Sequence, residues 1–375
     1  MVTLSAVYWL SLAALAARTF MALPTLCSLP APTRTSWPTL SIVIPARDEG
    51  VHVREALRAK LSDGYPALEV VLVDDRSTDD TGAQARALND SRLTVTRVDT
   101  LPEGWLGKVN ALQQGLEVAR GEWILFSDAD VHLAPGTLAR LISWAEDEAI
   151  DSVAAVPQVL AGGPVINVAL GTFFHFIVTL PRLWLVERPD SRAAIGIGAF
   201  NLFRRSALEK SEGLRWLKME IADDAALGML LKHSGARQRC VIAQEAVSLE
   251  FYPSYGVMAQ ALEKNGAQAP AGMILLGLML MLVLELGYVS ALVSSDHRVQ
   301  LCGLISWLVA VGTQLGICRW LRLPRWPAAV PGLGMLPLAV ALARSALLAW
   351  RRGGVRWRGT FYPTAVVRAG ARIKP

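Results

Sequence analysis

The run from Ala271 to Val293, AGMILLGLMLMLVLELGYVSALV, contains a single charged residue, Glu285. A helix needs roughly 20 predominantly apolar residues to cross the hydrocarbon core of a bilayer. The segment from Val299 to Cys318 has the same length and character. These two stretches predict membrane-spanning helices, which excludes a wholly soluble fold for the chain.

A third apolar stretch, Leu4 to Leu26, begins the sequence and is interrupted by Arg18. A cleaved signal peptide is the alternative interpretation. However, no basic segment follows Met1, and no small-residue cleavage site precedes the polar part of the chain. We therefore predict that residues 1–30 form an uncleaved N-terminal transmembrane anchor.

The last apolar stretch, Pro327 to Trp350, is broken in its first half by two prolines and two glycines. A broken helix of this kind favours a segment that enters the membrane and returns, or one that lies at its surface. We therefore predict a transmembrane and re-entrant region over residues 270–350.

Basic residues orient the membrane segments, because Lys and Arg favour the cytoplasmic side. Only Arg298 lies between the first two rear segments, whereas the loop after the second holds Arg319, Arg322 and Arg325. The tail, residues 351–375, is also basic and is predicted to be cytoplasmic. The chain is thus expected to be a multi-pass protein of a bacterial plasma membrane with its soluble domain in the cytoplasm. Contact with anionic lipid accounts for the net charge of +5 without a nucleic-acid partner.

Residues 39–268 alternate short apolar, β-rich runs with segments of helical periodicity. This alternation predicts an α/β fold, Rossmann-like, with a mostly parallel sheet covered by helices on both faces. In such sheets ligands bind beyond the carboxyl ends of the strands. The sequence contains neither GxGxxG nor GxxxxGK[ST], so a dinucleotide site and a P-loop are both disfavoured.

Pairs of acidic residues follow three of the predicted strands: Asp48 and Glu49, Asp74 and Asp75, and Asp128 and Asp130. For the turn after the second strand, helix capping is the alternative explanation. Asp128 and Asp130 share one face of an extended segment, because their spacing is two residues. Two carboxylates that converge need a positive partner, and oxygen ligands favour Mg²⁺ or Mn²⁺. The spacing therefore predicts a metal–diphosphate site.

The motifs SIVIPARDE, VVLVDDRSTDDT, GKVNAL, FSDADV and GAFNLFRRSALEKSEGLRWLKMEIADDAALGMLLKHSG together resemble glycosyltransferase family 2 over about Leu40 to Gly235. The membrane layout is similar to the ceramide glucosyltransferase and the hopanoid- and carotenoid-associated branches. The resemblance implies a GT-A catalytic domain with flanking transmembrane helices. It also implies a metal-dependent, inverting hexosyltransferase that moves one sugar from a nucleotide-sugar donor, a UDP-sugar, to a membrane lipid acceptor at the bilayer.

The resemblance also implies roles for single residues. Those expected to bind the nucleotide sugar are Pro45, Ala46, Asp48, Glu49, Asp75 or its neighbour Asp74, Lys108, Asp128 and Gly198. Asp128 and Asp130 resemble the DxD motif, in which Asp130 would bind the metal with help from Asp128. IADDAAL resembles the family's Glu-Asp box, which makes Asp224 the expected catalytic base and places Asp223 in the Glu position. A helix start that favours acids is the simpler alternative for this pair.

Two further features separate the alternatives. The stretch GVMAQALEKNGAQ stands where processive synthases and ceramide glucosyltransferases carry a [QR]xxRW motif, and it has no Arg-Trp pair. This disfavours a processive polysaccharide synthase, and the set of acids disfavours a catalytically silent membrane scaffold. The long uncharged segment within residues 163–194 is either a buried helix or an interfacial element that brings the domain to its lipid acceptor.

Overall fold

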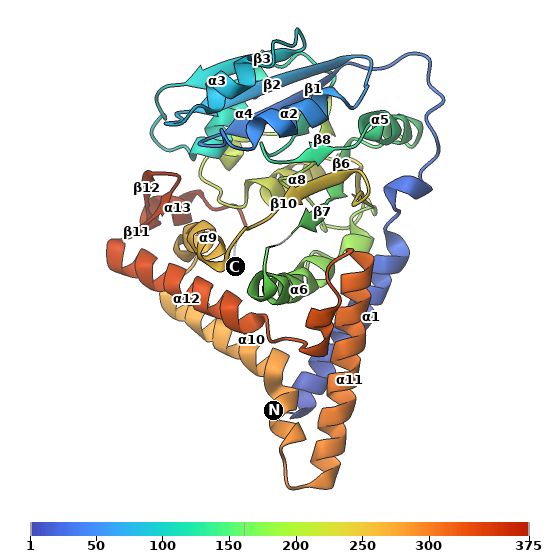
Figure 1. Cartoon of the computed structure of the whole chain (residues 1–375), viewed down its shortest axis with the longest axis vertical. Helices are drawn as coiled ribbons and strands as arrows, with labels where there is room; N and C mark the ends of the chain where they lie inside the picture. Colours follow the sequence, from blue (N-terminus) through green and yellow to red (C-terminus); the bar gives the residue numbers. More distant parts are fainter. Residues whose placement is uncertain (1, 161, 374–375) are drawn as a thin grey trace.

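The computed structural model describes residues 2–160 and 162–373. Figure 1 shows an α/β domain at the top of the view and a group of long helices below it. The largest sheet has seven strands in the order β3-β2-β1-β4-β8-β6-β9. Strand β8 pairs antiparallel with both of its neighbours, and the other pairings are parallel. The predicted α/β class with a mostly parallel sheet is therefore confirmed.

The strands of this sheet are β1 (Leu40–Ala46), β2 (Leu68–Asp75), β3 (Leu93–Val98), β4 (Trp123–Phe126), β6 (Ser152–Val156), β8 (Asn201–Arg204) and β9 (Gln238–Ile242). The helices of the domain are α2 (Val53–Leu61), α3 (Thr81–Arg86), α4 (Gly107–Val118), α5 (Thr137–Asp147), α7 (Arg205–Glu209), α8 (Asp223–His233) and α9 (Tyr255–Ala261). Short 3₁₀ turns are η1 (Leu26–Ser28), η2 (Leu183–Leu185), η3 (Leu214–Leu217), η4 (Leu262–Ala267) and η5 (Trp326–Ala329).

Alternate residues of β1 enter two separate cores, because successive side chains of a strand point to opposite faces. Ile42 and Ile44 pack into the core that contains Leu57 of α2. Val43 packs into the core that contains Val109 of α4. Burial on both faces explains why this strand is a continuous apolar run rather than an alternating one.

Two small sheets complete the strands. One consists of β5 (His132–Leu133), β10 (Val247–Glu250) and β7 (Gln158–Leu160). The other is a hairpin of β11 (Gly354–Trp357) and β12 (Thr360–Pro363), followed by α13 (Thr364–Gly370). In Figure 1 the hairpin lies beside the α/β domain, although it comes from the end of the chain.

Within the described residues, four helices are long and apolar enough to cross a membrane: Thr3–Ala22 in α1 (Val2–Ala22), Pro164–Leu185, Ala271–Leu292 (α10) and His297–Trp320 (α11). Three of them coincide with stretches predicted from the sequence. The fourth begins with α6 (Pro164–Thr179) and lies inside the segment that the sequence left between two interpretations. Half of its most apolar window is buried, against α1, α11 and α12.

The broken stretch from Pro327 to Trp350 forms η5 and then α12 (Met335–Arg352). Helix α12 lies against the domain, because Ser345 Oγ donates to the carbonyl oxygens of Leu262 (3.0 Å) and Glu263 (2.8 Å). Glu263 also forms an ion pair with Arg344 at 2.6 Å. The prolines and glycines thus separate α12 from the preceding apolar helix and allow it to pack along η4.

The long helices share one buried polar cluster around Glu285 of α10. Tyr8 of α1 donates a hydrogen bond to its carboxylate, and Trp9 Nε1 donates to its carbonyl oxygen at 3.3 Å. Nδ1 of His175, from α6, lies 3.9 Å from the same carboxylate. Because an ionisable group among apolar helices needs polar partners, this cluster fixes how α1, α6 and α10 pack together.

Candidate active site

The register of the parallel strands brings the predicted acidic pairs to one edge of the sheet. Ala46, at the end of β1, pairs with Asp74 of β2, and Val43 pairs with Phe126, the last residue of β4. The loops that carry Glu49 and Asp128 therefore leave the sheet side by side. This is the carboxyl edge, where the sequence predicted the ligand site.

The two aspartates after β4 lie in different electrostatic surroundings. Asp128 Oδ1 forms an ion pair with Lys108 Nζ at 2.8 Å. The backbone carbonyl oxygen of Asp128 accepts a hydrogen bond from Lys60 Nζ at 3.2 Å. Burial acts against ionisation, but Lys108 holds the pKa of Asp128 below its usual value. Burial and the Asp128 carboxylate raise the pKa of Asp130. Asp130 is thus the acid in this pair that most needs an added positive charge.

The Asp223–Asp224 pair begins α8 and faces the same space. The backbone N–H of Gly198 donates to Asp224 Oδ2 at 2.9 Å, and Asp223 lies 3.7 Å from Lys108 Nζ. Burial raises the pKa of Asp223 to about 6, and Asp224 adds to this shift against the opposing effect of Lys108. A helix N-terminus stabilises both carboxylates in this position.

Glycines allow α8 to approach the segment that carries Gly198. A Cβ on Gly196 would lie 1.8 Å from the carbonyl oxygen of Asp224, and one on Gly228 would lie 2.1 Å from that of Ile195. Both distances are far below any normal contact, so these positions exclude larger residues. The close approach is what places Asp224 beside Gly198.

One cavity is lined by six of the predicted site residues together with residues that the sequence did not single out. The predicted ones are Pro45, Lys108, Asp128, Gly198, Asp223 and Asp224. A Cβ on Gly198 would lie 3.2 Å from Asp128 Oδ2, 3.3 Å from Lys108 Nζ and 3.4 Å from Asp224 Oδ2. Gly198 therefore stands in the middle of the three charged groups and leaves the space between them open.

We predict that Gly198→Ala lowers the affinity for the sugar donor severalfold while the thermal unfolding temperature changes little. The added methyl group meets flexible side chains at tight but tolerable distances, so the fold can accommodate it, but it occupies the space between Asp128 and Asp224. Donor KM and the unfolding temperature measure the two effects. Ala199→Gly, at the next position, is the control. An unchanged KM in Gly198→Ala would show that no substrate group enters this space.

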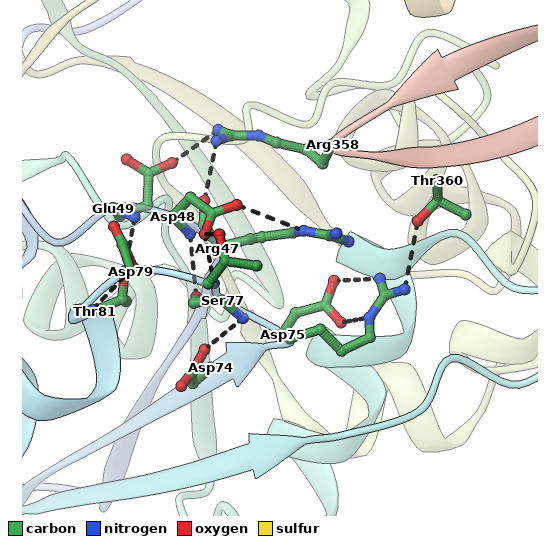
Figure 2. A network of polar contacts seen from close by, with 12 residues as sticks. Arg47, Asp48, Glu49, Asp74, Asp75, Ser77, Asp79, Thr81, Arg358 and Thr360 are labelled. Atoms are coloured by element: carbon green, nitrogen blue, oxygen red, sulfur yellow. Dashed lines mark hydrogen bonds and ion pairs between the residues drawn. The ribbon is translucent and has the colours of Figure 1, made fainter.

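The remaining predicted residues surround the ends of β1 and β2 (Figure 2). Asp74 is buried, accepts from the Ser77 backbone N–H at 3.1 Å and pairs with Arg97 at 2.9 Å. Arg76 donates two hydrogen bonds to the Asp75 carboxylate, from Nε at 2.7 Å and from Nη2 at 2.9 Å.

The loop after β1 is held by a different set of bonds. Asp48 accepts from the backbone N–H and hydroxyl of Thr78, at 2.7 and 3.1 Å. Ala46 is buried at the end of β1 and lies outside the cavity that Pro45 lines. These bonds organise the turns after β1 and β2, and nucleotide binding by Ala46, Asp48, Asp74 and Asp75 stays a prediction.

Glu49 lies near the DxD pair. Burial and the carboxylates of Asp130 and Asp128 raise the pKa of Glu49, whereas Arg358 lowers it. Three acids thus converge on one region: Glu49 from the loop after β1, and Asp128 and Asp130 from the loop after β4.

Four further residues lie at or beside the site. Lys60 is fully buried. Asn201 lines the cavity, and neither polar atom of its buried side chain has a partner among the described residues. Lys264 lies over the ring of Trp357 at 4.6 Å and is electrostatically coupled to Asp223. Arg358 reaches Glu49 at 2.8 Å from the C-terminal hairpin.

The carboxylates at this edge suit a hard divalent cation that is coordinated by substrate oxygens as well as by the protein. Among residues 2–160 and 162–373, no three His, Cys, Asp or Glu side chains are grouped as a closed metal cage. Asp128 and Asp130 supply carboxylate oxygens only, and Mg²⁺ or Mn²⁺ is typically held by one or two carboxylates plus substrate phosphates. The residues present therefore fit such an ion bound together with a diphosphate.

Comparison with solved structures defines the fold class. The chain superposes on the mannosyltransferase PcManGT from Pyrobaculum calidifontis, which was solved in complex with GDP-Man and Mn²⁺. The TM-score is 0.51 and the sequence identity 21%, over 98% of this chain and 95% of that one. The chain thus shares the fold of this mannosyltransferase, and the predicted GT-A fold class is confirmed.

Sequence comparison matches part of the chain to a known family. Residues 41–211 match the family described as Glycosyl transferase family 2. The probable glycosyltransferase YdaM of Bacillus subtilis is 28% identical over 207 residues, 53% of this chain and 47% of YdaM. The 4,4'-diaponeurosporenoate glycosyltransferase of Staphylococcus aureus is 36% identical over 93 residues, 25% of this chain and 24% of that protein. The matches thus cover less than half the length of either relative.

Proposed function

We propose that the protein is an inverting, metal-dependent glycosyltransferase that moves a single hexosyl group from a nucleotide-sugar donor, a UDP-sugar, to a membrane lipid. The family 2 domain and the GT-A fold support the transferase class. The gathering of Lys108, Asp128, Gly198 and Asp224 around one cavity supports a donor site at the carboxyl edge of the sheet.

The position of Lys264 is the observation that supports a lipid as the acceptor. Burial lowers the pKa of Lys264, whereas the carboxylates of Asp223, Asp224 and Asp128 oppose this shift, so the Lys264 ammonium group lies near these acids. The apolar helix α10 begins at Ala271, only seven residues later in the chain. Since each residue spans at most about 3.6 Å, the candidate base lies within a short distance of the end of a helix suited to a bilayer. A hydroxyl of a lipid in that bilayer could reach it.

Asp224 would accept the proton of the attacking hydroxyl. Its Oδ2 is fixed by the Gly198 N–H, and its carboxylate faces the cavity that Lys108 also lines. A positioned carboxylate is a suitable general base for this step. Lys108 would stabilise the negative charge of the departing nucleoside diphosphate. A bound Mg²⁺ or Mn²⁺ at Asp128 and Asp130 would supply Lewis-acid stabilisation of the same leaving group. Because the acceptor attacks directly and no carboxylate acts as nucleophile, one displacement inverts the anomeric centre.

The contacts of the long helices support a cytoplasmic catalytic domain. Thr25, just after α1, forms a β-bridge with Ile242, and Arg322, just after α11, pairs with Glu245 of the domain. The ends of α1 and α11 and the start of α10 therefore lie on the domain side. The Arg-rich loop after α11 lies on this side too, which the positive-inside rule assigns to the cytoplasm.

Incubation of membranes with labelled nucleotide sugars tests this proposal. We expect label from one donor in a panel of UDP- and GDP-sugars to enter the lipid extract when Mn²⁺ or Mg²⁺ is present. We also expect mass spectrometry to find one sugar per lipid, because the stretch GVMAQALEKNGAQ lacks the Arg-Trp pair that processive synthases carry at this place. Membranes without the protein are the control. Label that stays in water contradicts the lipid acceptor, and long polymer contradicts single-sugar transfer.

A further inference from the structure

The β11–β12 hairpin contacts the loops at the carboxyl edge of the large sheet as well as the neighbouring helix α12. Its Thr360 accepts from Arg76 Nη1 at 3.4 Å, and its buried Tyr362 accepts from the Gly107 backbone N–H at 3.2 Å. Arg76 follows β2, and Gly107 begins α4 directly before Lys108. More than 250 residues of sequence separate the two sides of these contacts. The hairpin therefore closes the nucleotide end of the site.

Arg358 occupies the turn of this hairpin and extends toward the loop after β1 (Figure 2). Its guanidinium donates to the Arg47 carbonyl oxygen at 3.0 Å and to Glu49 at 2.8 Å. Arg358 and Gly359 both have positive φ, 47° and 77°, which makes the turn tight. A Cβ at Gly359 would lie 3.2 Å from Arg47 Nη2. This turn geometry aims the Arg358 side chain at the acids rather than at solvent.

We propose that Arg358 binds the diphosphate of the sugar donor, exchanging the Glu49 carboxylate for phosphate oxygens when the donor arrives. This inference rests on the proposed function. It gives the C-terminal hairpin a direct part in donor binding, and it identifies Arg358 as a substrate-binding residue that lies far outside the family 2 match at residues 41–211.

The surroundings of Arg358 favour that exchange. Glu49 lies close to Asp128 and Asp130, so the guanidinium already stands next to the region expected to receive the diphosphate. Arginine binds phosphate oxygens through two parallel N–H groups, in the same geometry in which it binds a carboxylate. The Arg358 side chain is 52% exposed, and an ion pair this exposed is weak. The free energy lost when the Arg358–Glu49 ion pair breaks is therefore small compared with the free energy gained from a contact between Arg358 and phosphate.

Nucleotide binding to the purified full-length protein tests the proposal. UDP, UMP, GDP and GMP are titrated in the presence of Mn²⁺ against wild type, Arg358→Gln, Arg358→Lys and Arg356→Gln. We expect Arg358→Gln to weaken binding of the preferred nucleoside diphosphate about tenfold, the scale of one charge-assisted hydrogen bond, and to affect the monophosphate much less. Arg358→Lys should recover part of the loss. Arg356, an exposed arginine in the same hairpin, is the matched control and should behave as wild type.

The outcomes separate this inference from the proposed function. If Arg358→Gln binds the diphosphate as tightly as Arg356→Gln does, Arg358 is no ligand and the inference is overturned. An equal loss for diphosphate and monophosphate would assign Arg358 a structural role and overturn it as well, while leaving the transferase intact. A wild-type protein that binds neither diphosphate and transfers no sugar would overturn the proposed function, and this inference with it.

Discussion

Asp224→Asn is expected to abolish sugar transfer while leaving nucleoside diphosphate binding nearly unchanged. The amide keeps the shape of the side chain, and its oxygen can still accept from the Gly198 N–H, which is 2.9 Å from Asp224 Oδ2. What it cannot do is take a proton from the acceptor hydroxyl. General-base catalysis typically contributes 10²–10⁴-fold, so we expect the turnover number to fall by roughly that factor. Initial rates at saturating donor and UDP titration together measure both parts of the prediction.

Two comparisons make this result specific. Asp90→Asn, before β3 at the opposite edge of the sheet, changes an aspartate outside the site and should retain full activity. Asp223→Asn tests the neighbouring carboxylate, which Lys108 approaches at 3.7 Å. If Asp224→Asn retained wild-type turnover while Asp223→Asn lost it, the base would be Asp223. If both retained it, the reaction would not use the acids at the start of α8.

The core of the catalytic domain was predictable because its strands are defined by local pattern. A short, β-branched apolar run such as Ile42–Ile44 is typical of a strand buried on both faces, and parallel register then brings the following loops together. Asp128, Lys108, Asp223 and Asp224 therefore gather at one edge although they come from distant parts of the chain. The location of the site follows from topology. The roles of the individual residues remain predictions from the family resemblance.

The contact partners of Lys60 and Arg358 could not be predicted, because they are fixed only by the folded chain. Lys60 lies three residues after Leu57 on the apolar face of α2, which was a weak signal that the lysine is buried. Its partners are the carbonyl oxygens of Asp128 and Val131, about 70 residues away, and no side-chain pattern marks those. Burial lowers the pKa of Lys60 to about 8, although the two DxD carboxylates oppose the shift. Lys60 thus stabilises the backbone of the DxD loop through hydrogen bonds to its carbonyl oxygens.

Composition could not place the segment of α6 either. A buried helix and a helix in a membrane interface need the same apolar residues, because both environments exclude water. The structure buries part of this segment and leaves another part exposed. Half of its most apolar window is covered by the rest of the protein, whereas Val165 and Leu180 are exposed. The covered part fits the buried-helix interpretation, and contact of the exposed part with a membrane interface stays a prediction.

Asp130→Ala is expected to remove the metal dependence of donor binding. Burial and the neighbouring Asp128 carboxylate disfavour a negative charge at Asp130, and Lys108 pairs with Asp128 instead. The negative charge at Asp130 is therefore the part of the DxD pair left for a divalent cation to neutralise. In wild type we expect EDTA to weaken UDP or GDP binding roughly 100-fold, which corresponds to about 2.8 kcal/mol. In Asp130→Ala the affinity should be equally low with and without EDTA.

This design tests the metal site without relying on catalysis, because binding is measured by calorimetry in both metal states. Asp99→Ala, which removes an exposed carboxylate paired with Arg97 after β3, is the control and should keep the full response to EDTA. The decisive quantity is the difference between the two metal states rather than the affinity itself, since Asp130→Ala could also weaken direct contacts to the donor. An unchanged EDTA response in Asp130→Ala would place the cation elsewhere. Loss of the response in Asp130→Ala alone would assign the cation to Asp130, which forms no ion pair with another described residue, whereas Asp128 pairs with Lys108.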